Sequence, residues 1–206
     1  MATKRKGYMT LAEHHAQLKA EGKWDDYVAR TKARDEETAR KEREYTDAEA
    51  PIVQELQAAG SGVSSVWDLL STKQPYPRLI PILFAHLDRP YPERVREGIA
   101  RALAVPESRP LWDEIVNRFL AETDTTTHGM KWALHLAIAA AADISVVDTL
   151  IRLAVDRRHG RNRAMFVDAL ARMNDPRARV TLAELASDPD LGGDVQRVLK
   201  TQSPRP

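Results

Sequence analysis

Three stretches of the chain repeat one amphipathic helical pattern at intervals of 35 and 32 residues, over 95–103, 130–138 and 162–170. Aligning them places large apolar side chains in two columns and alanine in a third: Ile99, Leu134 and Phe166; Leu103, Ile138 and Leu170; Ala102, Ala137 and Ala169. Such a period is typical of solenoids, in which each unit buries its apolar face against the next. The repeat predicts an all-α fold.

Further helices are expected between these stretches. Pro-Tyr-Pro occurs at 75–77 and again at 90–92, and proline is favoured in the first turn of a helix. The predicted first helices of successive pairs span 78–87, 111–120, 146–155 and 179–186. The predicted second helices span 93–104, 129–142, 162–173 and a truncated 194–200. Leucines recur along the first helices with the same period, at Leu87, Leu120, Leu153 and Leu185. We therefore expect a right-handed α-solenoid of about four helix pairs over residues 76–200.

The turns between the predicted helices resemble those of HEAT-repeat proteins. HEAT units characteristically have an aspartate in the turn and an arginine or lysine early in the second helix. The matching pairs here are Asp156 with Arg163, Asp124 with Lys131, and Asp88 with Arg94 or Arg96. The last unit has Asp188 but Val195, which is typical of a terminal cap. The resemblance is to HEAT-like proteins of bacterial or phage type, and it implies a binding scaffold without fixed chemistry.

Residues 1–60 have a different pattern and are expected to form a charged helical extension. Thr10 and Glu13 form a capping-box signal, and Gly22 should end the helix that they begin. The segment 30–49 is predicted to be an exposed helix, because opposite charges recur four residues apart and almost no apolar side chain interrupts them. The pairs are Lys32–Glu36, Glu36–Arg40, Glu37–Lys41 and Arg40–Glu44.

The remaining boundaries follow from proline, glycine and serine. Pro51 is expected to begin a new helix that turns Ile52, Val53 and Leu56 inward. Residues 61–75 are predicted to be a linker with a short helical turn, and 201–206 a frayed tail.

Composition fits an elongated protein of the cytoplasm. The chain has 206 residues, of which 43% are hydrophobic, 30% charged and none cysteine. The absence of cysteine excludes disulfides and suits a reducing compartment. The basic N-terminus lacks the apolar core of a signal peptide, and no run approaches the roughly 18 apolar residues of a membrane span. We expect no contact with a membrane. Abundant alanine and an excess of arginine over lysine are typical of a GC-rich bacterium or its phage.

The sequence contains no recognisable catalytic or metal-binding motif. Its six histidines form no HxxxH or HExxH pair, and no cysteine is present to complete a metal site. No GxSxG elbow occurs, and Gly60-Ser-Gly62 lacks the lysine of a phosphate-binding loop. We therefore predict a protein that is not an enzyme and needs no cofactor.

An arginine-rich segment is the first candidate binding site. Residues 152–179 contain eight arginines and three aspartates in a chain whose net charge is +1. Arg157, Arg158 and Arg161 exceed what one Asp–Arg pair at a turn would need. Two interpretations are open, a solvated edge or a patch that binds an anion or an acidic protein.

Trp132 and Leu136 form the second candidate site. They stand where the other repeats have Glu97 and Ala164, and Arg101 and Asp168, respectively. Because they are four residues apart, they lie on one face of a helix. They either pack against the charged N-terminal helix or a shorter neighbouring unit, or form an exposed apolar spot. Tryptophan is among the residue types most enriched at interface hot spots.

The leading hypothesis is a non-enzymatic scaffold or adaptor that binds another protein on its concave face, including an inhibitor or neutraliser of that partner. Its candidate residues are Trp132, Leu136, Arg157, Arg158 and Arg161. The alternative is nucleic-acid binding through the arginines of 152–179. HEAT-like alkylpurine DNA glycosylases combine arginines, tryptophans and an aspartate, and Trp112, Asp113, Trp132 and Arg161 offer the same residue types.

Overall fold

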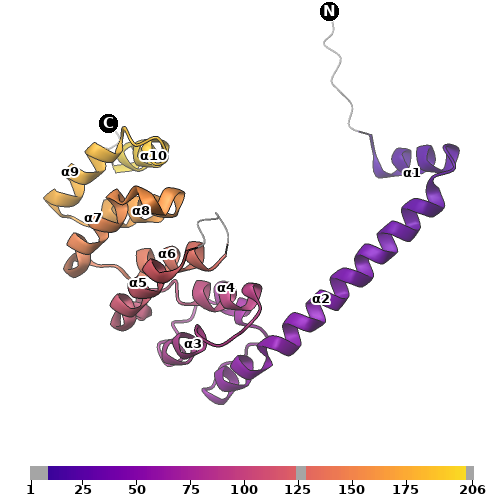
Figure 1. Ribbon diagram of the computed structural model, residues 1–206, viewed down its shortest axis with the longest axis horizontal. Helices are drawn as coiled ribbons and strands as arrows, with labels where there is room; N and C mark the ends of the chain where they lie inside the picture. Colours follow the sequence, from indigo (N-terminus) through magenta and orange to yellow (C-terminus); the bar gives the residue numbers. More distant parts are fainter. Residues whose placement is uncertain (1–8, 124–128, 203–206) are drawn as a thin grey trace, which may run out of the picture. The chain divides into compact units, whose positions relative to one another are not determined.

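The computed structural model describes residues 9–123 and 129–202 (Figure 1). The chain divides into two compact units, Met1–Asp47 and Ala48–Pro206. The division comes earlier in the chain than the boundary expected at residue 60. Ile52, Val53 and Leu56 are buried, and they belong to the second unit.

The first unit consists of two consecutive helical segments without a buried side chain among residues 9–47. Helix α1 (Leu11–Ala20) begins with the predicted capping box, in which the Glu13 carboxylate accepts from Thr10 N at 2.7 Å. Gly22, with φ of 66°, separates α1 from α2 (Trp24–Ala58). His15, Trp24 and Tyr27 make ring contacts at centroid distances of 4.9 to 5.8 Å. Three of the predicted ion pairs form: Lys32–Glu36, Glu37–Lys41 and Arg40–Glu44.

The sequence predicted that Pro51 begins a new helix, and this is wrong: Pro51 lies inside α2. It has no N–H to donate to the carbonyl of Asp47 one turn earlier, and this normally costs helix stability. Burial of Ile52, Val53 and Leu56 compensates, because it stabilises the two turns that follow the proline.

The second unit contains all eight helices predicted for the repeat region. They are α3 (Ile80–His86), α4 (Glu93–Ala102), α5 (Trp112–Ala121), α6 (Met130–Ala141), α7 (Val147–Val155), α8 (Ala164–Arg172), α9 (Pro176–Leu185) and α10 (Gly192–Gln202). Helix α10 has 11 residues, so the expected truncation of the last helix is wrong. Short 3-10 helices lie between them or precede them: η1 (Val66–Ser71), η2 (Pro106–Leu111), η3 (Ile144–Val146) and η4 (Arg157–Arg163).

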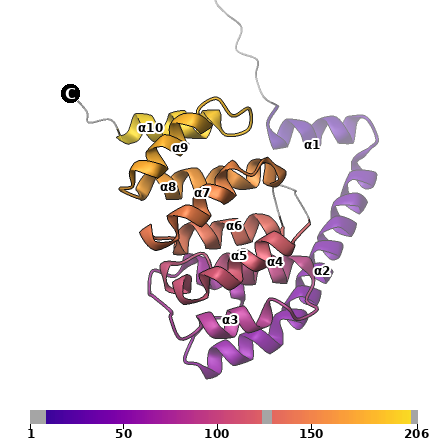
Figure 2. The ribbon, with the colours of Figure 1, turned by 60° about the vertical axis from the view of Figure 1, so that its left-hand side comes forward.

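Helices of the second unit pack in chain order (Figure 2). The second helices contact one another in succession, α4 against α6, α6 against α8, and α8 against α10. Each first helix packs on the second helix that follows it: α3 on α4, α5 on α6, α7 on α8 and α9 on α10. The 3-10 helix η1 packs on α4, so residues 66–71 belong to the packed region rather than to a linker.

The three predicted columns of the second helices form the core. All nine side chains are at most 1% exposed, and among them Ile99, Leu103, Ile138, Phe166 and Leu170 are fully buried. The leucine column of the first helices is wrong at one position, because Leu120 is 50% exposed. In α5 the inward face carries Trp112, Ile115, Val116 and Phe119, and Leu120 lies one step beyond that face.

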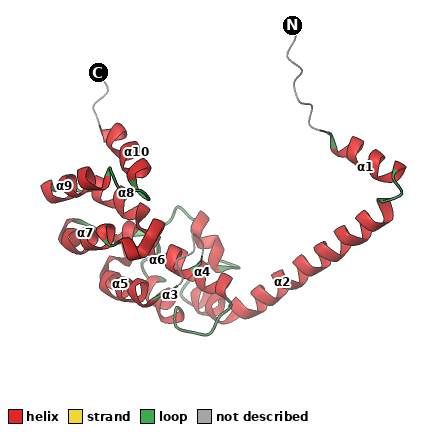
Figure 3. Cartoon of the chain, turned by 45° about the horizontal axis from the view of Figure 1, so that its top comes forward, coloured by secondary structure: helices red, strands yellow, loops and turns green. Residues whose placement is uncertain are grey.

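The described residues are helical or loop and include no β-strand (Figure 3). Within them no single helix is long and apolar enough to cross a membrane. Two helical segments, Met130–Ala141 and Ile144–Val155, reach that length and apolar content only when taken together, and they are bent by 120° at the break between them.

Candidate functional site

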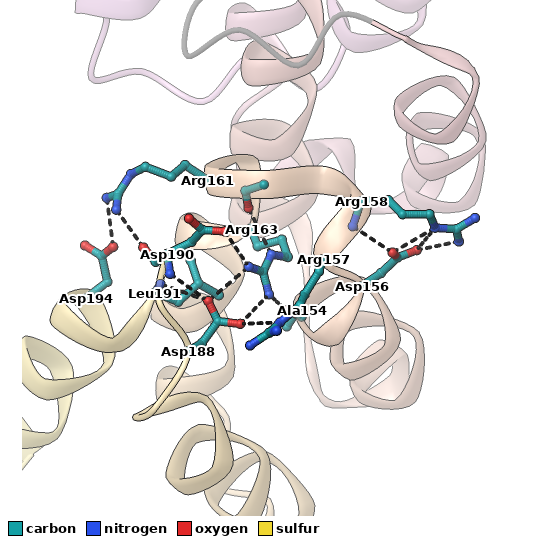
Figure 4. A network of polar contacts seen from close by, with 11 residues as sticks. Ala154, Asp156, Arg157, Arg158, Arg161, Arg163, Asp188, Asp190, Leu191 and Asp194 are labelled. Carbon is teal, nitrogen blue, oxygen red and sulfur yellow. Dashed lines mark hydrogen bonds and ion pairs between the residues drawn. The ribbon is translucent and has the colours of Figure 1, made fainter.

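The three arginines predicted to bind a partner lie on η4, and each contacts an aspartate (Figure 4): Arg157, Arg158 and Arg161. Arg157 Nε is 3.3 Å from Asp188 Oδ2. Arg158 makes a bidentate contact with Asp156, whose two carboxylate oxygens accept from Nε and Nη2 at 2.9 and 2.6 Å. The arginines thus face carboxylates of their own chain.

Arg161 and Arg163 reach the last helix pair. Arg161 donates to the carbonyl of Asp190 at 2.6 Å and to the Asp194 carboxylate at 3.0 Å. Arg163 is completely buried and holds Asp188 by two hydrogen bonds of 3.1 Å each. Its other hydrogen bonds go to Asp190 Oδ2, to the carbonyl of Ala154 and to that of Gly160. These five bonds use all five guanidinium N–H donors.

Asp156 and Arg163, which the HEAT-like pattern matched by position, each pair with another residue. Asp156 caps η4, accepts from Arg158 N and pairs with the Arg158 side chain. Arg163 instead pairs with Asp188, the turn aspartate of the following helix pair. Asp88 likewise pairs with Arg118, whereas the HEAT-like pattern matched it by position with Arg94 or Arg96.

The third pair matched by the pattern was Asp124 with Lys131. Lys131 donates to the carbonyl of Glu122 at 2.6 Å, whereas Asp124 lies outside the described residues.

Charge in the η4 region is balanced. Four arginines face four aspartates: Arg157, Arg158, Arg161 and Arg163; Asp156, Asp188, Asp190 and Asp194. Hydrogen bonds from Arg158 lower the pKa of Asp156 to about 2. Burial raises the pKa of Asp188, but bonds from Arg163 and two backbone N–H groups outweigh it and bring the pKa to about 2. Residues 188–194 lie beyond the segment whose excess of arginine suggested a basic patch.

Trp132 and Leu136 are both partly buried on α6. The guanidinium group of Arg101, on α4, lies over the Trp132 ring at 5.1 Å from its centroid and over the Trp67 ring at 5.3 Å. Arg94 also lies over Trp67, at 5.7 Å. We call Trp67, Arg101 and Trp132 the tryptophan–arginine stack. Trp132 thus packs against the neighbouring helix pair, one of the two arrangements that the sequence left open, and remains partly exposed.

Local sequence explains how Trp67 reaches α4. Ser65 and Asp68 form a capping box that begins η1 and fixes the turn carrying the indole. On α4 the indole lies against Gly98, where an added Cβ would stand 2.8 Å from Trp67 Nε1. Glycine inside a helix costs about 0.5–1 kcal/mol relative to alanine, but here only glycine leaves room for the ring.

Sequence reasoning missed Trp67 and Arg101 as site residues. In the sequence Arg101 stands out only as the polar counterpart of Leu136, and Trp67 falls in the short helical turn predicted within residues 61–75. A signal was present, since Trp67, Arg101 and Trp132 follow one another at intervals of 34 and 31 residues, close to the repeat period.

Trp112 and Arg161, two of the residues suggested for a nucleic-acid site, make structural contacts within the chain. Trp112 is only 3% exposed and donates from Nε1 to the carbonyl of Ile138 at 3.0 Å, so its ring is not available to stack on a base. Asp113 is exposed in the first turn of α5. Arg161 is bound to the last helix pair.

Comparison with known proteins adds no relative, because no family model, curated protein or solved structure matches the chain. Within residues 9–123 and 129–202 no group of three or more His, Cys, Asp or Glu side chains is arranged to hold a metal ion.

Proposed function

We propose that this protein is a non-enzymatic scaffold that binds a partner protein through its second helices. In this proposal the second unit is a right-handed HEAT-like α-solenoid of four helix pairs. Successive packing of α4, α6, α8 and α10 and the three buried columns support this assignment.

The tryptophan–arginine stack is the observation that carries the proposal. Tryptophan and arginine are among the residues most enriched at interface hot spots, which are well packed and lose their water on binding. Trp132 and Arg101 are both partly exposed, and neither occupies a core column. Their contacts with each other reduce the side-chain freedom that binding would otherwise remove. Leu136, one turn along α6, adds an apolar contact on the same face.

Nucleic acid is the less favoured partner. Nucleic-acid binding rests on cations that neutralise successive phosphates. The arginines around η4 are already paired with aspartates of the chain, and Trp112 is buried in the core. Arg157, Arg158 and Arg161 are therefore assigned a structural role in this proposal, and the partner surface is centred on Trp132 and Leu136.

The test is capture of partners from the cells that make the protein, with the native chain and with Trp132→Ala as baits, followed by quantitative mass spectrometry. Removal of a hot-spot tryptophan should weaken a specific partner by about 2 kcal/mol or more. Trp24→Ala is the matched control, because Trp24 is also partly buried but belongs to the first unit.

Two results would contradict the proposal. One is equal recovery of every captured protein with both variants. The other is a melting temperature for Trp132→Ala as low as that of a core variant, which would make Trp132 part of the fold rather than of a binding surface.

A further inference from the structure

The guanidinium group of Arg101 lies between two aromatic contacts and has no hydrogen-bonded partner among the described residues. Its Cζ atom is 5.3 Å from the ring centroid of Trp67 and 5.1 Å from that of Trp132, within the range of cation–π attraction. Its ion-pair partner is Glu97, whose Oε1 is 3.6 Å from Nη1, too far for a hydrogen bond. The Arg101 side chain is 32% exposed, so part of it is open to a ligand.

We propose that Arg101 is a carboxylate-binding site that recognises an Asp or Glu side chain of the partner protein. This inference rests on the proposed function and names the chemistry of its partner. Two N–H groups of an arginine match the two oxygens of a carboxylate, and the bidentate pair has a fixed orientation. The two indoles restrict the movement of the guanidinium group and reduce its contact with water, which strengthens a charge-assisted hydrogen bond.

The surroundings favour a single carboxylate over a polyphosphate chain. A nucleic acid needs several cations in a row, and among residues 9–123 and 129–202 the only other cation over a ring of the stack is Arg94. Glu97 lies beside Arg101, and its negative charge repels a chain of phosphates more strongly than it repels a single carboxylate. Trp132 offers an apolar contact beside the guanidinium group, and Leu136 lies one turn along the same face of α6. The fitting ligand is therefore an acidic residue flanked by apolar side chains, on a partner protein.

The experiment is an NMR titration of the full-length chain with acetyl-glutamate amide, whose side-chain carboxylate is its only charge. We expect saturable shifts of the Arg101 Nε–H and of the Trp67 and Trp132 Nε1–H signals at millimolar ligand. Acetyl-glutamine amide, which is neutral and nearly the same shape, should give no saturable shift. Inorganic phosphate, titrated in parallel, tests the competing anion.

Variants then assign the effect to Arg101. Arg101→Gln should abolish the shifts of both indole signals, and Arg101→Lys should weaken them strongly, because lysine keeps the charge but lacks the bidentate edge. Arg152→Gln removes the same charge from an exposed site on α7 and should change nothing. Melting curves show that each variant is folded.

Three results would overturn the inference: no saturable shift with the glutamate derivative, a stronger response to phosphate, or an unchanged response in Arg101→Gln. These outcomes are separate from failure of the proposed function. If Trp132→Ala loses its partner while the glutamate derivative does not bind, the scaffold stands and the carboxylate site does not. If the derivative binds but Trp132→Ala keeps every partner, the proposed surface fails instead.

Discussion

The two units of this chain form helices for different physical reasons. In residues 9–47 no side chain is buried, and helical structure rests on a capping box and on charged pairs three or four residues apart. In the second unit the helices bury whole columns of side chains, and α6 alone buries nine residues. Local pairs contribute tenths of a kcal/mol each, whereas one buried apolar side chain contributes about 1.5–3 kcal/mol. The second unit should therefore hold nearly all the cooperative stability.

The sharpest way to test this difference is to truncate one aromatic residue in each unit. Phe166→Ala should lower the free energy of unfolding by about 3–5 kcal/mol, because Phe166 is completely buried and contacts the rings of Phe119 and His135. Trp24→Ala removes a larger ring from the first unit and should leave the main transition unchanged. Urea denaturation followed by circular dichroism measures both. A similar loss in the two variants would show that the first unit unfolds together with the second.

The stability of the second unit also depends on a buried charge pair, Arg163 with Asp188. Asp188→Asn should cost about 3–5 kcal/mol, because it leaves the completely buried Arg163 without its main counter-charge. Asp194→Asn is the matched control. It removes the partner of the half-exposed Arg161, and a smaller loss is expected. If the two variants melt at the same temperature, the Arg163 network contributes little to the docking of the last helix pair.

Much of the second unit could be predicted because one helical pattern occurs three times, and comparing the copies shows which positions carry apolar side chains. The period places Ile99, Leu134 and Phe166 on equivalent turns, and each is buried for the reason that the pattern gave. The pattern was wrong for Leu120, because one step around a helix is enough to turn a side chain from the core to the solvent. It was wrong for Pro51, because burial of the residues after the proline outweighs the preference of proline for the first turn of a helix.

The candidate site was less predictable because its contacts join different repeats. Arg163 and Asp188, or Trp67 and Arg101, meet only once the helix pairs are stacked. Counting charge along residues 152–179 therefore suggested a basic patch, although the balancing aspartates follow in the next pair. Trp132 was recognised because it departs from the repeat pattern. Trp67 lies before the first repeat and offered no such contrast.

Acid should destabilise the second unit through two of its buried histidines, His135 and His159. Burial lowers the pKa of His135 from 6.5 to about 4, and it lowers the pKa of His159 as well. The folded protein then binds fewer protons than the unfolded chain between these values, so stability is complete above pH 6.5 and falls as the pH drops toward 4. For His135 the loss is on the order of 2–3 kcal/mol. Denaturation at a series of pH values should show it, and His135→Leu should flatten the slope. An unchanged slope in that variant would contradict the assignment.

The smallest effect is expected on the exposed face of α2. Glu37→Gln removes a carboxylate that pairs with both Arg40 and Lys41, all of them well exposed to solvent. Exposed pairs are screened by water and salt, so the melting temperature of the chain should not change measurably. Hydrogen exchange is the sensitive readout. Amides of residues 30–47 should already exchange faster than those of 95–103 in the native chain, because no packed core closes over them, and the variant should accelerate only the first group. Exchange of 30–47 as slow as that of 95–103 in the isolated monomer would mean that tertiary contacts, rather than local pairs, hold this helix.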